Sequence, residues 1–303
     1  MPIKPFREML KTDQFLVTAE TGVTKGSDTT RMVECIELLR DKVHAISATD
    51  NKSAVMRYPS LGTCLLIKEL GGEPVLDITC RDRNRLAIQG DLLFAWSRGI
   101  STVLCLTGDS MDVGEDKQAK AVFDLDCDQL VNLVHTLNSG KDMAGTELNG
   151  GTGFCIGITT PAKEKSDSSA EERLRKKLAP GVDFVIIQAI YSLDDLKRLV
   201  TSIIKNDTKV KILAGIMPLI SVAMGRYMNS NMPGVFVPEH VLDEIGQAPK
   251  GRSLSAGIEF AAKMIRQIKE EKICDGVHIM FPGREERIGE VIELGGLIGV
   301  TQR

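Results

Sequence analysis

The feature that most constrains the fold is a short apolar, β-branched segment that recurs eight times along the 303 residues. Helices cover both faces of a parallel sheet, so the strands of such a sheet are apolar throughout, as these segments are. The predicted strands are residues 15–19, 43–48, 74–79, 101–107, 153–158, 183–188, 210–216 and 276–280.

Helical spacing fills the stretches between the predicted strands. Residues 29–41 repeat apolar side chains on one helical face, and residues 86–99 run as a helix to Gly99. Eight strands that alternate with helices predict one α/β domain over residues 1–303, a (β/α)8 TIM barrel with an N-terminal helix and inserted loops. An open doubly wound sheet is the structural alternative. The apolar face of the first helix consists of Met32, Cys35, Ile36 and Leu39.

Two long insertions interrupt the repeating pattern, at residues 110–126 and 229–252. Loops of more than about 12 to 15 residues in a compact domain are usually functional lids or disordered segments. We therefore expect both insertions to be lids or docking segments, with exposed Met and Val side chains in residues 229–240.

The composition argues against several classes of function. The chain has 38 Lys and Arg against 41 Asp and Glu, and 4% aromatic residues, so nothing supports a nucleic-acid surface. The seven cysteines stand singly and the four histidines lack ligand spacing, so we expect reduced core thiols and no bound metal. His44 and His278 are expected to be satisfied core residues. With no run of about 18 apolar residues and no apolar leader, we expect a cytoplasmic protein with no membrane partner.

Polar residues follow several predicted strands at the point where each strand ends. In a (β/α)8 barrel the carboxyl ends of all strands open into one mouth, where the chemistry takes place. Two carboxylates and an amide, from Glu20, Asp109 and Gln188, are expected to converge there. Taken singly, Glu20 is an ordinary surface carboxylate and Asp109 an ordinary turn or helix cap. The other predicted strand-end residues are Thr49, Thr79, Cys80, Thr159 and residues 215–218.

A basic segment, residues 172–181, places Arg173, Lys176 and Lys177 on a predicted helix. Its ordinary interpretation is a solvated basic face. Beside the barrel mouth, the same cations would hold the phosphates of a cofactor.

Seven short motifs in order resemble the methylenetetrahydrofolate reductase family over nearly the whole chain. They are "TAE", "AISAT", "DITC", "LTGD", "RKKLAPGVDFVIIQ", "AGIMPL" and "FPGRE". The resemblance implies a flavin-dependent barrel that reduces 5,10-methylenetetrahydrofolate to 5-methyltetrahydrofolate. "CRDRNR" and "VFDLD" are similar to the version found in anaerobic one-carbon pathways, some members of which work with a partner subunit. The family resemblance also implies that the protein is an oligomer.

By the same resemblance, Glu20 is the acid that protonates the folate nitrogen, and Asp109 lies beside flavin and pterin. Gln188 binds the pterin, and Arg284 faces the glutamate tail of the folate. The flavin, either FAD or FMN, contacts Thr49, Leu106, Thr107, Gly108, Lys176 and Lys177.

The chemistry explains the need for two carboxylates. Opening the methylene bridge requires a protonated leaving nitrogen. Burial raises the pKa of a carboxyl, so we expect Glu20, buried in a mouth roofed by flavin, to be held protonated. Asp109 as an anion stabilises the developing cation. Gly108 is expected to let the backbone approach the flavin ring, with no room for a Cβ.

The chain departs from the family where relatives bind the nicotinamide donor and the flavin nucleotide. It lacks the aromatic pair after Glu20, has Thr107 where relatives often have Arg, and has Asp77 where they often have His. We therefore expect poor oxidation of NADH, and electrons from a second subunit or a low-potential carrier. The alternative functions are a flavin-free methyltetrahydrofolate-binding methyltransferase barrel and a non-catalytic folate-binding subunit.

Overall fold

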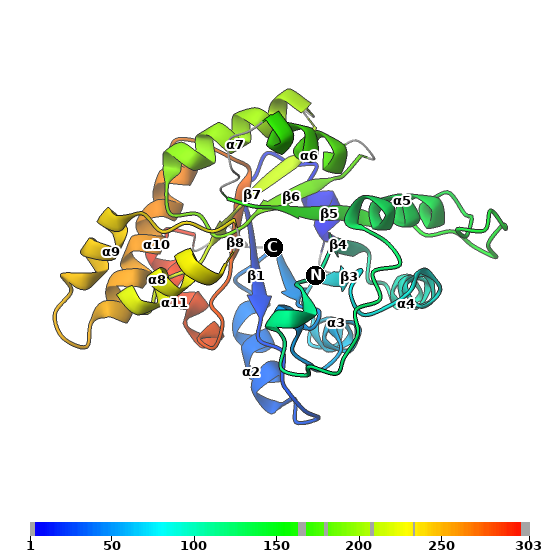
Figure 1. Ribbon diagram of the computed structural model, residues 1–303, viewed down its shortest axis with the longest axis horizontal. Coiled ribbons are helices and arrows are strands. Elements are labelled where there is room, and N and C mark those ends of the chain that lie inside the picture. The colour runs from blue at the N-terminus through cyan, green and yellow to red at the C-terminus, as the bar shows by residue number, and fades with distance from the viewer. Residues whose placement is uncertain (1–3, 163–167, 179–180, 207–208, 233, 298–303) are drawn as a thin grey trace.

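Eight parallel strands close into a barrel in chain order, β1 to β8, in the computed structural model of the protein (Figure 1). The structure describes residues 4–162, 168–178, 181–206, 209–232 and 234–297. The TIM barrel prediction is confirmed, and the open-sheet alternative is wrong. The strands are β1 (Leu16–Thr21), β2 (Ala45–Ala48), β3 (Pro74–Thr79), β4 (Thr102–Leu106), β5 (Cys155–Thr160), β6 (Phe184–Ile187), β7 (Lys211–Ile216) and β8 (Gly276–Ile279).

Helices surround the barrel, as Figure 1 shows. The apolar face predicted for the helix in residues 29–41 is confirmed, because Met32, Cys35, Ile36 and Leu39 are the buried residues of α2. The helices are α1 (Phe6–Met9), α2 (Thr30–Leu39), α3 (Ser60–Glu69), α4 (Arg85–Ser97), α5 (Cys127–Asn138), α6 (Ser168–Leu178), α7 (Leu193–Asn206), α8 (Val222–Asn231), α9 (Glu239–Gly246), α10 (Ser253–Glu270) and α11 (Ile288–Leu294). Three single turns are η1 (Lys52–Ala54), η2 (Met111–Val113) and η3 (Glu285–Arg287).

The amino-terminal end of the barrel has an apolar floor that α1 closes. The Phe6 ring meets the Phe184 ring edge to face, with the ring centres 5.5 Å apart. Gly157 makes room for the Phe184 ring, since a Cβ at position 157 would lie 2.2 Å from that ring. The Phe6 backbone N–H donates to the Glu73 carboxylate at 3.1 Å, which fixes the helix on the floor. The floor seals one end, so ligands have access only to the carboxyl end.

The second insertion is not the exposed segment that we expected. Residues 229–252 contain helix α9, and Val235 and Val237 are buried in a second apolar cluster with residues of α8 and α9. Phe236 is 42% exposed. The valines are buried because α9 gives them an apolar surface that the sequence pattern did not reveal. In the first insertion, Val113 and Phe123 are exposed.

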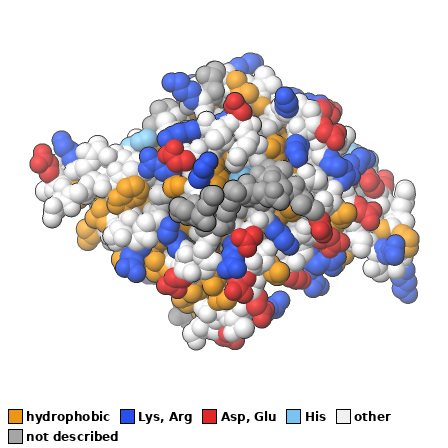
Figure 2. All heavy atoms as spheres, turned by 180° about the vertical axis from the view of Figure 1, so that it is seen from behind, with side chains coloured by type: hydrophobic (Ala, Val, Ile, Leu, Met, Phe, Trp, Pro, Cys, Tyr) orange, Lys and Arg blue, Asp and Glu red, His pale blue; other side chains and the backbone are white. Residues whose placement is uncertain are grey.

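The surface carries mixed charge, with acidic and basic side chains interspersed on the face shown in Figure 2. Six of the seven cysteines are buried and all seven are free thiols, as predicted. In the described ranges, no helix combines the length and apolar character needed to cross a bilayer.

Candidate active site at the carboxyl end of the barrel

Glu20 lies inside the barrel near the carboxyl end of β1, with its side chain 15% exposed. Side chains alternate along a strand, so Glu20 follows Leu16 of the floor and Thr18 into the interior. Its Oε2 is 2.6 Å from the Nζ of Lys52, which comes from the loop after β2. Its Oε1 is 4.0 Å from the Nε2 of His278 on β8.

His278 is buried, as expected, but it is also part of the site. Its Nδ1 is 2.8 Å from the hydroxyl of Thr18, and its other ring nitrogen faces Glu20. The closure of the barrel causes this contact, because β1 pairs with β8 and Thr18 lies opposite His278 in the register. Sequence patterns alone could not separate this residue from His44, the buried histidine that precedes β2.

The neighbours of Glu20 favour its ionised form. Burial opposes ionisation of the carboxyl, but the Lys52 ammonium and His278 outweigh it and lower the pKa of Glu20 to about 2. The prediction of a protonated Glu20 concerns a mouth roofed by flavin, and it stays a prediction. It considered burial without the cation that the loop after β2 supplies.

Asp77 is a second buried carboxyl in the barrel interior. It is 4% exposed on β3, and the Ser47 hydroxyl donates to its Oδ1 at 2.5 Å. Burial raises the pKa of Asp77 well above its ordinary value, and the negative charges of Glu20 and Asp50 act in the same direction. In the sequence, Asp77 stood out only because relatives often have His there.

Asp109 is exposed at the end of β4 and accepts a hydrogen bond from the backbone N–H of Ser53 at 2.9 Å. The preceding Gly108 has φ +91°, and a Cβ there would lie 2.8 Å from the Cβ of Arg81 and 3.2 Å from that of Thr79. The protein's own packing therefore requires the glycine, which is a different reason from the flavin contact that we expected.

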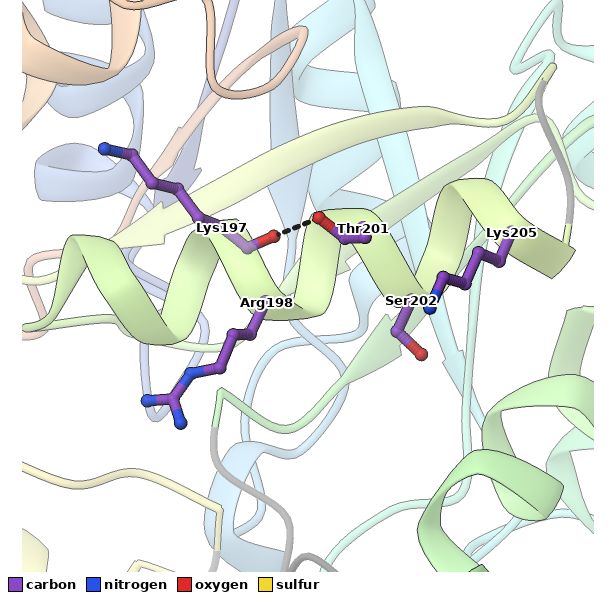
Figure 3. Close-up of a pocket in the computed structure, with 5 residues that line it drawn as sticks. All are labelled: Lys197, Arg198, Thr201, Ser202 and Lys205. Carbon is purple, nitrogen blue, oxygen red and sulfur yellow. Dashed lines mark hydrogen bonds between the residues drawn. The ribbon is translucent and has the colours of Figure 1, made fainter.

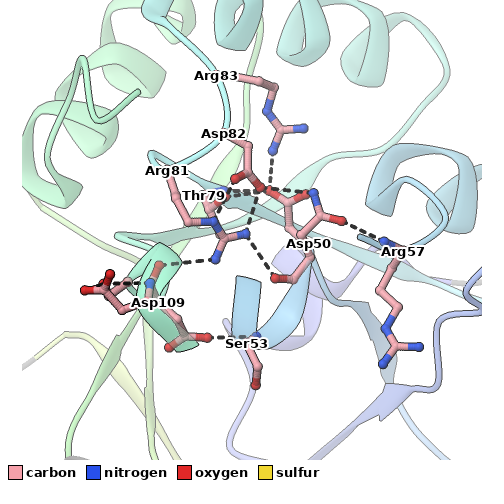
Figure 4. A network of polar contacts seen from close by, with 11 residues as sticks. Asp50, Ser53, Arg57, Thr79, Arg81, Asp82, Arg83 and Asp109 are labelled. Carbon is pink, nitrogen blue, oxygen red and sulfur yellow. Dashed lines mark hydrogen bonds and ion pairs between the residues drawn. The ribbon is translucent and has the colours of Figure 1, made fainter. Parts of the chain in front are cut away.

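A polar network joins the loops after β2, β3 and β4 (Figure 4). The guanidinium of Arg81, 1% exposed, pairs with Asp82 at 2.7 Å and donates to the backbone oxygen of Asn51 at 3.0 Å. The buried Asp50 carboxylate accepts from the Thr79 N–H at 2.8 Å and pairs with Arg83. The "CRDRNR" segment thus acts as a scaffold that fixes these loops.

Gln188 lies just beyond β6, on the inward-facing register of that strand. Its backbone N–H donates to Thr160 at 2.8 Å. Its side-chain Oε1 is buried and, within the part of the chain described, has no hydrogen-bond partner. A Cβ at Gly234 would lie 3.0 Å from this oxygen, so the second insertion covers it. A buried acceptor without a partner is costly, and a ligand N–H would satisfy it.

Most of the predicted flavin residues lie at the carboxyl ends of β2, β4 and β5. Thr49 and Leu106 are partly exposed and Thr107 is exposed, at the carboxyl ends of β2 and β4. The Lys177 ammonium donates to the Thr159 backbone oxygen at 3.5 Å, which brings it to the end of β5.

Two predicted residues are exposed and lie close to carboxylates of their own segments. The Lys176 side chain is 65% exposed and 3.7 Å from Glu172 on its own helix. Arg284, after β8, is 54% exposed and 3.9 Å from Glu286. The neighbouring ends of β4 and β5 therefore offer backbone, an apolar side chain and one cation, a set that fits a phosphate-bearing flavin.

A hollow of about 340 Å³ lies outside the barrel, on α7 (Figure 3). Two of its cations are partnered: Lys197 pairs with Glu271 at 2.7 Å, and Arg198 pairs with Asp195. None of the predicted site residues lines this hollow. Over the residues that the structure describes, no group of three or more His, Cys, Asp or Glu is placed to hold a metal ion.

Comparison with known proteins identifies one family. Residues 5–296 match the family model described as methylenetetrahydrofolate reductase. The chain is similar in structure to an uncharacterized protein from Clostridium thermocellum that binds two copies of 5-methyl-5,6,7,8-tetrahydrofolic acid. The identity is 14% and the TM-score 0.65, over 97% of this chain and 99% of that one. It is also similar to the EDTA monooxygenase EmoA from Chelativorans sp. BNC1, with 12% identity and a TM-score of 0.59 over 95% of both chains. At these identities the two structures show the shared fold.

Proposed function

Because this chain belongs to the methylenetetrahydrofolate reductase family, we propose that it is a flavin-dependent enzyme that reduces 5,10-methylenetetrahydrofolate to 5-methyltetrahydrofolate. One barrel carries both flavin and folate. The observation that carries this proposal is the interior carboxylate of Glu20 at the mouth, which pairs with Lys52 and faces His278, with the buried carboxyl of Asp77 on β3. The folate specificity rests on the family and not on the structural neighbours, which show the fold alone.

The flavin is held at the rim of the mouth by the ends of β2, β4 and β5. Thr49, Leu106, Thr107 and Gly108 contact it, and we assign its phosphate to Lys177, since Lys176 pairs with Glu172. The bound flavin supplies the hydride. FAD and FMN both carry a phosphate that suits this cation.

The residues around the folate divide its recognition and its protonation. The unpartnered Oε1 of Gln188 accepts a hydrogen bond from the pterin, and Arg284 faces the glutamate tail. Glu20 takes up a proton as the substrate arrives and gives it to the leaving nitrogen, so that the ring opens to an iminium ion. The Asp109 carboxylate stabilises that cation through space.

The absorbance of the purified protein tests this function directly. We expect a yellow protein with flavin bands, or one that acquires them on incubation with FAD or FMN. A colourless protein that cannot be reconstituted would favour the methyltransferase barrel or the non-catalytic folate-binding subunit instead. Binding of methyltetrahydrofolate by the colourless protein, followed by methyl transfer to an acceptor, would then separate these two alternatives.

The electron donor is a second prediction. The chain lacks the aromatic residues that hold the nicotinamide in relatives, so the isolated protein should oxidise NADH slowly while it reacts with an artificial dye. Electrons would come from a second subunit or a low-potential carrier. Steady-state assays with NADH, NADPH and reduced ferredoxin as separate donors check this. NADH turnover at ordinary enzymatic rates of ~1 to 10³ per second would exclude the need for a partner.

A further inference from the structure

The loop that carries Lys52 has an unusual backbone. Asn51, Ser53 and Ala54 have φ of 44°, 58° and 54°, a left-handed region that side chains other than glycine rarely adopt. Such a residue persists only where its surroundings hold it, and strain of this kind gathers at functional sites. Elsewhere in the described residues, the non-glycine residues with positive φ are Phe123 and Lys272.

Contacts from the loops after β3 and β4, and one within the loop itself, hold this backbone in place. The Asp109 carboxylate accepts from the Ser53 N–H at 2.9 Å, and Arg81 donates to the Asn51 backbone oxygen at 3.0 Å. The Asn51 side chain donates to Asp82 at 3.0 Å and accepts from the backbone N–H of Arg57 at 2.9 Å. Figure 4 shows Ser53 beside Asp109 within this network.

The first insertion also packs closely on this loop. A Cβ at Gly114 would lie 2.4 Å from the Ala54 backbone oxygen, so only glycine permits the contact. The loop is thus fixed from β3, from the end of β4 and from the first insertion. These contacts together fix the position of the Lys52 side chain.

We propose that Lys52 is a positioning residue that holds the Glu20 carboxylate in its charged form inside the barrel. Asp109 fixes the loop that carries Lys52. The ammonium lies 2.6 Å from Glu20 Oε2. This inference rests on the proposed function, because it concerns the group assigned there as the proton carrier. Asp109 then has a second role, because its carboxylate fixes this loop through Ser53 rather than by acting on the ligand.

The titratable groups around this ion pair come from three other strands or their ends. Glu20 on β1 faces His278 on β8, and the carboxyls of Asp77 on β3 and Asp109 after β4 favour the charged form of Lys52. Of these neighbours, Lys52 has the largest effect in lowering the pKa of Glu20. Protonation of Glu20 therefore requires that its ion pair with Lys52 be broken.

Carbon-13 NMR of protein labelled in the Glu carboxyl carbons tests the proposal. The Glu20 signal is identified by its loss in Glu20→Gln. In the wild type we expect Glu20 to stay a carboxylate down to the lowest pH at which the protein is folded. In Lys52→Met, an uncharged side chain of similar length, burial is opposed only by His278, so the pKa of Glu20 should rise from about 2 to above the ordinary value of ~4.3.

Two variants separate charge from structure. Lys52→Arg keeps the positive charge and should restore the low pKa of Glu20. Lys25→Met removes the lysine of a surface pair, Lys25 with Glu115, and should leave the Glu20 titration unchanged. If Lys52→Met fails to fold, the wild-type titration still tests the proposal, since an ordinary or raised pKa of Glu20 would overturn it.

The titration is independent of flavin and folate. A colourless protein would overturn the reductase assignment and leave the Lys52–Glu20 result standing. Conversely, unchanged titration of Glu20 in Lys52→Met, or no rescue by Lys52→Arg, would overturn the role of Lys52 in a protein that still binds flavin.

Discussion

Replacing Glu20 with Gln should lower the rate of methylenetetrahydrofolate reduction by about 10²-fold or more, the usual scale for a lost general acid. Gln has nearly the same shape but cannot carry the proton that the leaving nitrogen needs. Reduction of the flavin by its donor should survive, because Glu20 is not assigned to that step. Stopped-flow measurement of the two half-reactions separates these outcomes.

The matched control for this substitution is Glu115→Gln, which changes a surface carboxylate that pairs with Lys25 in the same way that Glu20 pairs with Lys52. It should leave both half-reactions unchanged. An equal loss of rate in the two half-reactions of Glu20→Gln would instead mean that Glu20 is structural, and that the interior ion pair serves only the fold.

The second large effect concerns the floor of the barrel. Phe184→Ala should lower the free energy of unfolding by about 3 to 5 kcal/mol, the usual range for deleting a buried phenyl ring. Phe184 is 1% exposed, packs on Phe6 and fills the space left by Gly157, so its loss leaves a cavity that neighbouring strands cannot fill. Denaturant unfolding followed by circular dichroism measures the change.

Phe94→Ala is the control for the floor, because Phe94 is 46% exposed on α4. It should change the free energy of unfolding by about 1 kcal/mol or less. A change of similar size in Phe184→Ala would contradict the packing of the barrel floor.

The barrel itself could be predicted from the sequence because its signals are local. A strand covered on both faces must be apolar along its length, and a surface helix must repeat apolar residues on one face. Both patterns are visible without knowledge of any contact, which is why the eight strands and the buried face of α2 were predicted. The same reasoning located the ends of the strands, and with them Glu20, Asp109 and Gln188.

The second insertion shows where local patterns stop being sufficient. Val235 and Val237 look like exposed apolar residues in a long loop, but they are buried against α8 and α9. Their burial depends on a surface formed by other segments. A sequence pattern contains no information on whether such a surface is present.

The sequence by itself determined the fold, the family resemblance and the set of strand-end residues that share the barrel mouth. Only the tertiary structure decided the charges within that mouth. Glu20 meets His278 because β1 pairs with β8 when the barrel closes, and it meets Lys52 because a strained loop after β2 is fixed by Asp109. A pKa depends on the distances to neighbouring charges and on burial together. Those distances exist only in the closed barrel, so the opposite pKa shifts of Glu20 and Asp77 could not be predicted from the chain alone.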